Sequence, residues 1–133
     1  MADNQEMFTS EWVEGFAQRW NKTEEMVIPL AQADFNAIIG FGFKGEVGPR
    51  VLVDVRAGEV ARAGLSTNES PIPDWDLRAN PEQWQKWRTE PLTLAGLGVA
   101  VAGGALEFKR GDYRKMIRQM QLAKPFLHFF NLL

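Results

Sequence analysis

Few residues in this sequence have the type and spacing that catalysis requires. His128 is the single histidine, and there is no cysteine. General acid–base chemistry by a histidine needs an orienting partner and a nucleophile, and no serine stands in a GxSxG context. Asp74 and Asp76 could form a carboxylate pair, but their spacing is more typical of the solvated face of a strand. We therefore expect no catalytic residue, no metal site and no enzymatic activity.

The segment from 95 to 104 is rich in glycine and invites comparison with nucleotide-binding loops. Gly96, Gly98 and Gly103 do not give the GxGxxG spacing, and no Lys-Ser or Lys-Thr pair follows as in a P-loop. Small residues here fit close packing or a flexible wall over a ligand cavity. The sequence therefore predicts no cofactor.

The composition is that of a globular chain with an unusual supply of aromatic side chains. Of its 133 residues, 45% are hydrophobic and 24% charged, and nine are Phe and five Trp. A net charge of −2 argues against nucleic acid as a partner, because phosphate binding needs a concentrated basic surface. The first six residues are polar and acidic, unlike a secretory signal, and no apolar run reaches the roughly 20 residues that span a bilayer. We expect a single cytoplasmic domain over residues 1–133.

Hydrophobic periodicity predicts an α+β fold. Alternation predicts strands over residues 35–43, 51–56, 59–65, 74–79 and 105–110. Helical spacing predicts helices over 9–22, 24–32 and from 81 to the proline at 91. The segment 92–102 is expected to be a loose helix or turn-rich. A last long helix is expected to start at Gly111-Asp112 and to break at Pro125.

The second half of the chain resembles the sterol carrier protein type 2 family of lipid-binding domains. The resemblance rests on the strand start Asp74-Trp75-Asp76-Leu77, a helix with Trp84 near its middle, the connector through Ala100-Val101, and the stretch from Gly104 to Asp112. It implies a five-stranded, largely antiparallel sheet covered on one face by helices. It also implies an apolar cavity between them for sterols, fatty acids or acyl-CoA. The tail from 126 to 133 is far more apolar than the family's ending requires.

Large, adaptable side chains after residue 83 are candidates to line that cavity. The residues predicted to bind the apolar ligand are Trp84, Trp87, Leu97, Val101, Leu106, Phe108, Met116, Met120 and Phe126. Core packing is the alternative for any one of them. The predicted function is non-catalytic binding and carriage of a lipid, fatty acid, acyl-CoA or sterol-like molecule.

The last predicted helix and the tail leave alternatives open. Lys109, Arg110, Arg114, Lys115, Arg118 and Lys124 form the main basic cluster. A basic helix followed by an apolar tail can lie on an anionic membrane surface, or the charges can simply solvate the helix. The tail from 126 to 133 can fold over the cavity, touch a membrane or join a homodimer interface. The alternative function is therefore a homodimerisation or accessory module of a system that metabolises hydrophobic compounds.

Overall fold

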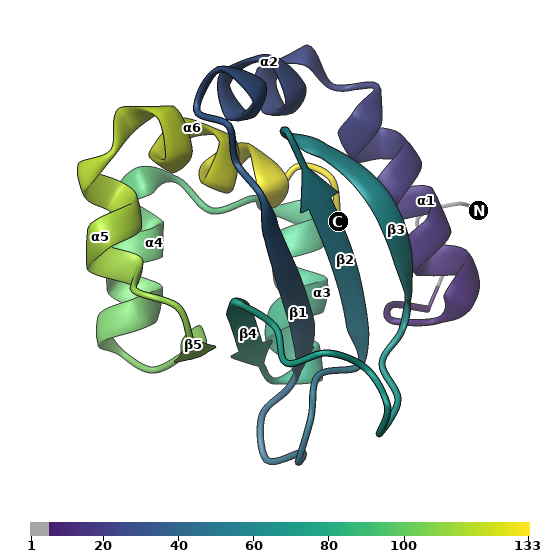
Figure 1. The fold of residues 1–133 in the computed structure, drawn as a ribbon. Helices are drawn as coiled ribbons and strands as arrows, with labels where there is room; N and C mark the ends of the chain where they lie inside the picture. The colour runs from purple at the N-terminus through teal and green to yellow at the C-terminus, as the bar shows by residue number, and fades with distance from the viewer. Residues whose placement is uncertain (1–5) are drawn as a thin grey trace.

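A five-stranded mixed sheet forms the centre of the protein (Figure 1). The computed structural model describes residues 6–133, except for the side chains of residues 120 and 121. The strands are β1 (Ala37–Phe43), β2 (Val51–Arg56), β3 (Glu59–Leu65), β4 (Trp75–Ala79) and β5 (Glu107–Arg110). Their order is β3-β2-β1-β4-β5, with β1 and β4 parallel and every other pair antiparallel. The predicted largely antiparallel five-stranded sheet is confirmed.

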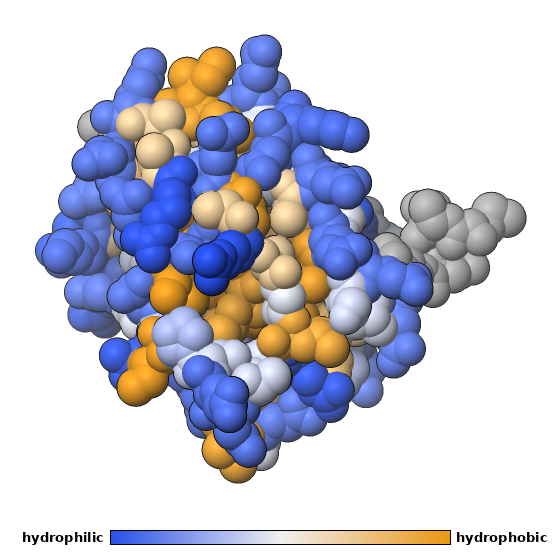
Figure 2. Space-filling model, turned by 45° about the vertical axis from the view of Figure 1, so that its right-hand side comes forward, coloured by the Kyte–Doolittle hydropathy of each residue, from blue (hydrophilic) through white to orange (hydrophobic). Residues whose placement is uncertain are grey.

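Helices cover the face of the sheet that carries its apolar side chains. They are α1 (Ser10–Asn21), α2 (Glu24–Gln32), α3 (Pro81–Thr89), α4 (Leu94–Ala102), α5 (Tyr113–Arg118) and α6 (Met120–Phe129). Figure 1 shows α3 and α6 behind β1, α1 beside β3, and α4 and α5 together at the opposite side. Most large apolar side chains are buried. Hydrophilic residues predominate on the face shown in Figure 2, and apolar ones appear in a central hollow and at the top and bottom edges.

The first helix forms where the aromatic spacing predicts it. Thr9 is its N-cap, and its Oγ1 accepts a hydrogen bond of 3.1 Å from the Trp12 backbone N–H. The helix buries Trp12, Val13, Phe16 and Trp20. These residues recur at three- and four-residue intervals, so they share one helix face. That face packs toward β3 and supplies the aromatic part of the core.

The β1–β2 connection folds back over the outer face of the sheet. A Cβ atom added to Gly42 would lie 2.9 Å from the backbone nitrogen of Arg50. Any larger residue would therefore push the connection away from β1. This cover explains why polar groups on the outer side of β4 are buried.

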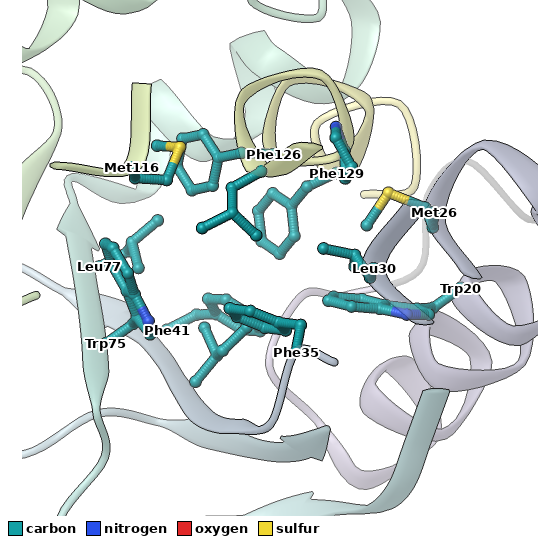
Figure 3. Close-up of a pocket in the computed structure, with 13 residues that line it drawn as sticks. Trp20, Met26, Leu30, Phe35, Phe41, Trp75, Leu77, Met116, Phe126 and Phe129 are labelled. Carbon is teal, nitrogen blue, oxygen red and sulfur yellow. The ribbon is translucent and has the colours of Figure 1, made fainter. Parts of the chain in front are cut away.

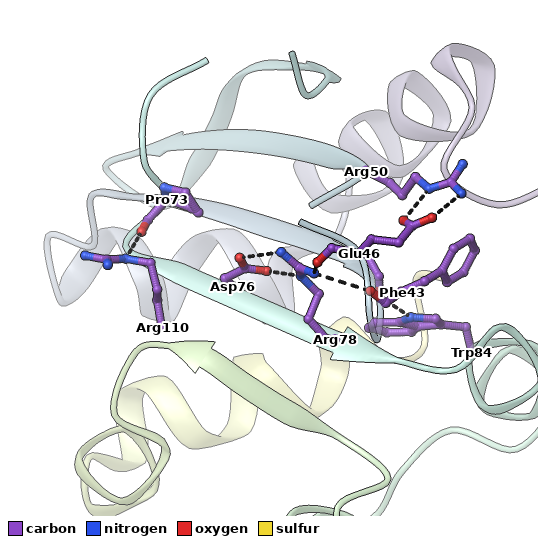
Figure 4. Close-up of polar contacts among 9 residues, drawn as sticks. Phe43, Glu46, Arg50, Pro73, Asp76, Arg78, Trp84 and Arg110 are labelled. Carbon is purple, nitrogen blue, oxygen red and sulfur yellow. Dashed lines mark hydrogen bonds and ion pairs between the residues drawn. The ribbon is translucent and has the colours of Figure 1, made fainter. Parts of the chain in front are cut away.

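Asp76 and Arg78 are the buried polar pair beneath that connection, so the expectation of a solvated Asp76 is wrong. Arg78 is fully buried and Asp76 is 5% exposed. The Nε of Arg78 donates to Oδ1 of Asp76 at 2.6 Å, and its Nη1 donates to the carbonyl oxygen of Glu46 at 2.9 Å (Figure 4). Asp74 remains exposed, and its Oδ2 accepts from the backbone N–H of Ile38 at 2.8 Å. Alternation placed both carboxylates on the outer face, but it could not show that a loop covers one of them.

The expected last helix is two helices, and its predicted break at Pro125 is wrong. The chain leaves helical geometry at Gln119, which is extended (φ −102°, ψ 107°), whereas Pro125 lies inside α6. The turn at Gln119 changes the helix direction, so α5 and α6 can each place apolar side chains against the sheet. The segment 92–102, expected to be a loose helix or turn-rich, contains the helix α4. Its N-cap is Thr93, whose Oγ1 accepts a hydrogen bond of 3.0 Å from the Gly96 N–H.

The apolar tail folds into the protein's own core. Phe129, Phe130, Leu132 and Leu133 are all buried. Trp12 Nε1 donates to the carbonyl oxygen of Leu133 at 3.2 Å, and Arg19 Nε donates to that of Leu132 at 2.7 Å. The alternative of a dimer interface needed this tail at the surface, so it finds no support in the described residues.

Candidate functional site

An apolar pocket lies between the sheet and the helices α1, α2, α5 and α6 (Figure 3). Its free volume is about 40 Å³. The residues that line it are Trp20, Met26, Leu30, Phe35, Ile39, Phe41, Trp75, Leu77, Met116, Leu122, Pro125, Phe126 and Phe129. Every one of these side chains is predominantly apolar, so the pocket has the chemistry of a hydrophobic ligand site.

Two parallel strands build the floor of the pocket. Ile39 and Phe41 alternate along β1, so their side chains share one face. The parallel register pairs Ile39 with Trp75 and Phe41 with Leu77. These four side chains therefore form two adjacent rows on one face of the sheet, one row on β1 and one on β4.

The aromatic rings of α6 cover that floor. The ring of Phe129 lies 4.9 Å from the ring of Phe41 and 5.2 Å from that of Phe16. Phe126 stacks parallel to Phe129, with ring centroids 6.0 Å apart. Met116 of α5 points toward the same space from the side (Figure 3). The α5–α6 pair thus forms one wall of the pocket, and the strands form the opposite one.

Trp20 presents an apolar surface to the pocket because its polar atom is used elsewhere. Its Nε1 donates a hydrogen bond of 2.8 Å to the carbonyl oxygen of Gly58 in the β2–β3 turn. Gly58 has a φ of +85°, and a Cβ there would lie 2.5 Å from the backbone nitrogen of Ala31. Only glycine allows this turn to touch α2. The contact joins the β2–β3 turn to α2, which supplies Met26 and Leu30 to the pocket.

The free volume decides what the pocket can hold in this conformation. A space of about 40 Å³ accommodates little more than a water molecule, and an apolar site of that size stays dry. Sites for drug-sized ligands have volumes of roughly 300–1,000 Å³. In this conformation the pocket is therefore too small for a lipid-sized ligand.

The residues predicted from the sequence fall into separate places. Met116 and Phe126 line the apolar pocket. Trp84 and Trp87 lie in another buried cluster, where Trp84 packs on Phe8 and Trp87 on Phe130, with ring centroids 5.5 Å apart in both pairs. Leu97 is fully buried in the core. The side chain of Met120 lies outside the part of the chain that the structure describes.

Three further predicted residues border a surface groove between α4, β5 and α5. Val101, Leu106 and Phe108 line it together with polar groups that include Lys44 and Arg114. Its volume is about 550 Å³, and it is open to solvent. The ring of Phe108 lies 5.8 Å from that of Phe126, a pocket residue, so Phe108 separates the groove from the pocket.

Most pocket residues were not singled out by the sequence. Ile39 and Phe41 are prominent in the alternation of β1, and Trp20 in the stripe of α1, but these patterns equally predict ordinary core packing. The signal that could have found them is the combined excess of aromatic residues on two strands and one helix. Which of those faces leave a space between them depends on tertiary packing.

Within residues 6–133, no group of three or more acidic or histidine side chains could hold a metal ion. The Nδ1 of His128 lies 3.4 Å from the Nδ2 of Asn131. No helix among the described residues has the length and apolar character needed to cross a membrane.

Proteins of known structure share this architecture. No protein-family model matches the chain, and no curated protein gives a significant match. A crystal structure of sterol carrier protein 2 superposes with a TM-score of 0.68 at 19% identity, covering 94% of this chain and 97% of that one. The chain has the sterol carrier protein 2 fold. A solution structure from Thermus thermophilus, described as possibly a sterol carrier protein, gives 0.66 at 20% identity over 94% and 87%.

A third structure with this fold is described as UbiJ-SCP2, a ubiquinone synthesis protein. Its TM-score is 0.53 at 11% identity, covering 88% of this chain and 87% of that one. At these identities, what the three structures share with this chain is the fold. The fold predicted from the Asp74 to Asp112 resemblance is thereby confirmed.

Proposed function

We propose that this protein binds and carries an apolar ligand, such as a fatty acid, acyl-CoA or sterol-like lipid, without acting on it chemically. The observation that carries the proposal is the entirely apolar lining of the pocket between the β1–β4 floor and the α5–α6 wall. The description of structures with this fold as sterol carrier proteins supports the same ligand class.

The proposed mechanism is partition into a pocket that opens. The ligand leaves water or a membrane and gains about 25 cal/mol per Å² of apolar area buried. Room for it comes from displacing α5 and α6, because the sheet floor is fixed by strand pairing on both sides. The extended residue Gln119 between the two helices is the natural hinge. Binding therefore exchanges contacts such as Phe129–Phe41 for contacts with the ligand.

Filling the pocket tests the proposal. A Met116→Trp variant adds a large ring to the pocket wall, and we expect it to weaken binding of the fluorescent fatty acid cis-parinaric acid at least tenfold. Ile28→Trp is the matched control, because Ile28 is 50% exposed on α2 and its side chain does not line the pocket. The control should bind as the wild type does. Circular dichroism of both variants verifies that they fold.

The position of the ligand can be tested with the protein's own tryptophans. Trp20 and Trp75 line the pocket, whereas Trp87 does not. A brominated fatty acid should quench part of the tryptophan emission, and this quenched part should shrink in Trp20→Phe and Trp75→Phe but not in Trp87→Phe. The proposal fails if the wild type binds neither fatty acid, or if Trp87→Phe alone removes the quenching.

A further inference from the structure

The helix α4 exposes an apolar face to solvent along most of its length. No polar side chain occurs from Leu94 to Ala102. Leu97 and Ala100 are buried on one side of the helix. Leu94 is 57% exposed and Val99 73% exposed on the other side.

The exposed positions of α4 form one continuous surface. Leu94, Ala95, Val99 and Ala102 are exposed, and Gly98 is half-buried among them. At 100° per residue these positions fall within an arc of about 140°, opposite the buried pair. A helix that is apolar all round is normally buried on all sides. The outer face of α4 therefore lacks the cover that its composition calls for.

Basic side chains border this face. Gly98 of α4 lies beside the hydroxyl of Tyr113, the first residue of α5, since a Cβ at Gly98 would be 3.8 Å from it. Residues 107–118 carry five basic residues against the two acids Glu107 and Asp112. All five bases are exposed: Lys109, Arg110, Arg114, Lys115 and Arg118. The carboxylate of Asp112 already accepts one hydrogen bond, of 3.1 Å, from the backbone N–H of Lys115 to its Oδ1.

The opposite side of the molecule has the reverse charge. Residues 6–34, which include α1 and α2, hold six acidic residues against Arg19 and Lys22. Figure 1 shows α1 on the right and the α4–α5 pair on the left. An anionic surface would attract the α4–α5 side and repel the other, so it would select one orientation of the protein.

We propose that the outer face of α4, together with the cations of β5 and α5, docks on an anionic phospholipid membrane. Leu94 and Val99 enter the boundary between headgroups and acyl chains, and the bordering Lys and Arg side chains pair with lipid phosphates. The charge complementarity favours this occupant over an uncharged partner. The surface is distinct from the apolar tail, which is buried in the core.

The docked orientation would also serve the ligand pocket. Met116 of α5 lines the pocket while its neighbours Lys115 and Arg118 face solvent. Docking therefore brings the movable α5–α6 wall to the membrane surface. This consequence rests on the proposed carrier function, whereas the docking itself does not.

Vesicle flotation tests the docking surface. The full chain is mixed with phosphatidylcholine vesicles that contain 30% phosphatidylglycerol, or with pure phosphatidylcholine. We expect the protein to float with the anionic vesicles only, and the bound fraction to fall as salt is raised, because charges at the surface are screened within about 10 Å at 0.1 M salt.

Two pairs of variants identify the surface. Leu94→Glu with Val99→Glu should lower the partition coefficient at least tenfold. Ile28→Glu with Val47→Glu is the matched control, since both side chains are exposed apolar residues on other elements. The control should change the coefficient less than twofold. Equal losses in both pairs would overturn the proposal, because they would reflect added negative charge alone.

The contribution of the cations has its own matched comparison. Replacing Arg114, Lys115 and Arg118 with glutamine should reduce binding to the anionic vesicles and weaken its dependence on salt. Glutamine at the exposed residues Lys22, Arg62 and Lys86 should change neither. Near a charged membrane each cation contributes about 1 kcal/mol, or about fivefold in partition.

Sedimentation velocity separates this proposal from self-association. If the wild type is a dimer that Leu94→Glu with Val99→Glu makes monomeric, while neither protein binds vesicles, the face of α4 is a contact between copies and the membrane proposal is wrong. Flotation does not require lipid uptake into the pocket. A protein that floats yet fails to bind cis-parinaric acid would therefore refute the carrier function and leave the docking surface standing.

Discussion

The ring of Phe41 on β1 and the ring of Phe129 on α6 lie 4.9 Å apart and join the floor of the pocket to its cover. Both residues are buried, and Phe129 also packs against Phe16. Aromatic contacts therefore keep the free volume of the pocket small, and the proposed ligand would have to replace them. Under the proposed carrier function, the stability of the empty form is balanced against the affinity for the ligand.

Removing the ring of Phe129 should shift that balance. We expect Phe129→Ala to lower the free energy of unfolding by about 3–5 kcal/mol, measured by urea denaturation, because it leaves a cavity in the core. The same change enlarges the pocket. Cis-parinaric acid should therefore raise the melting temperature of Phe129→Ala more than that of the wild type.

Phe130→Ala provides the matched control for this variant. Phe130 is fully buried beside Trp87 but does not line the pocket. Its loss should cost a similar amount of stability without increasing the stabilisation by ligand. If both variants gain equally from the fatty acid, the ligand occupies some other part of the core.

The strands could be predicted closely from the sequence because their signal is local. Period-two alternation from Ala37 to Phe43 and the Ala57-Gly58 turn fix where strands begin and end. Periodicity contains no information about strand order. The parallel β1–β4 pair arises from the crossover through residues 66–74, a long-range contact that the family resemblance implied only in outline.

The candidate site could be predicted less well, because it depends on how helices pack. The sequence placed the cavity between the sheet and residues 84–120, and two of its candidates, Met116 and Phe126, line the pocket. Trp84 instead donates its Nε1 hydrogen to the carbonyl oxygen of Gly42 at 2.9 Å, beneath a different part of the sheet. A helical stripe shows which face is buried but not which neighbour it meets.

The anchoring of the tail predicts a role for Arg19 in stability. Its Nε donates to the carbonyl oxygen of Leu132 at 2.7 Å. Burial and, secondarily, the positive charge of Arg88 lower the pKa of Arg19 from its ordinary value, yet a guanidinium remains protonated near neutral pH. We expect Arg19→Met to cost about 1 kcal/mol of unfolding free energy, since relief of the Arg–Arg repulsion offsets part of the lost hydrogen bond.

Hydrogen exchange distinguishes this local effect from a general one. Amide protons in the segment 129–133 should exchange faster in Arg19→Met, while those of β1 and β2 should keep their protection. Arg62→Met, at an exposed position on β3, is the control and should change neither. Uniform loss of protection across the sheet would show that Arg19 supports the core rather than the tail.

An exposed ion pair in the β1–β2 connection gives a prediction about pH. Hydrogen bonding to Arg50 lowers the pKa of Glu46 below 4.5, and Arg50 Nη2 lies 2.6 Å from Glu46 Oε2. A depressed folded-state pKa contributes stability above the unfolded value and loses it as pH falls through the folded one. Arg50→Met should raise the pKa of Glu46 toward its ordinary value, as measured by NMR titration. The stability change at pH 7 should stay within about 0.2–1 kcal/mol, because the pair is exposed.

The buried pair Asp76–Arg78 should respond very differently from that exposed one. Arg78→Met leaves the Asp76 carboxylate buried without its partner, and it removes the donor that serves the carbonyl oxygens of Phe43 and Glu46. We expect a loss of about 3–5 kcal/mol in the free energy of unfolding.

A double-mutant cycle separates the pair from its surroundings. Arg78→Met combined with Asp76→Leu removes both charges together, and this double variant should recover most of the lost stability, because no charge is then left unpaired. Recovery should be incomplete, since the two carbonyl oxygens stay without their donor. The exposed pair Glu46–Arg50, treated in the same way, should change stability by less than about 1 kcal/mol. If the double variant is no more stable than Arg78→Met, the hydrogen bonds to Phe43 and Glu46, and not the ion pair, hold the β1–β2 connection against the sheet.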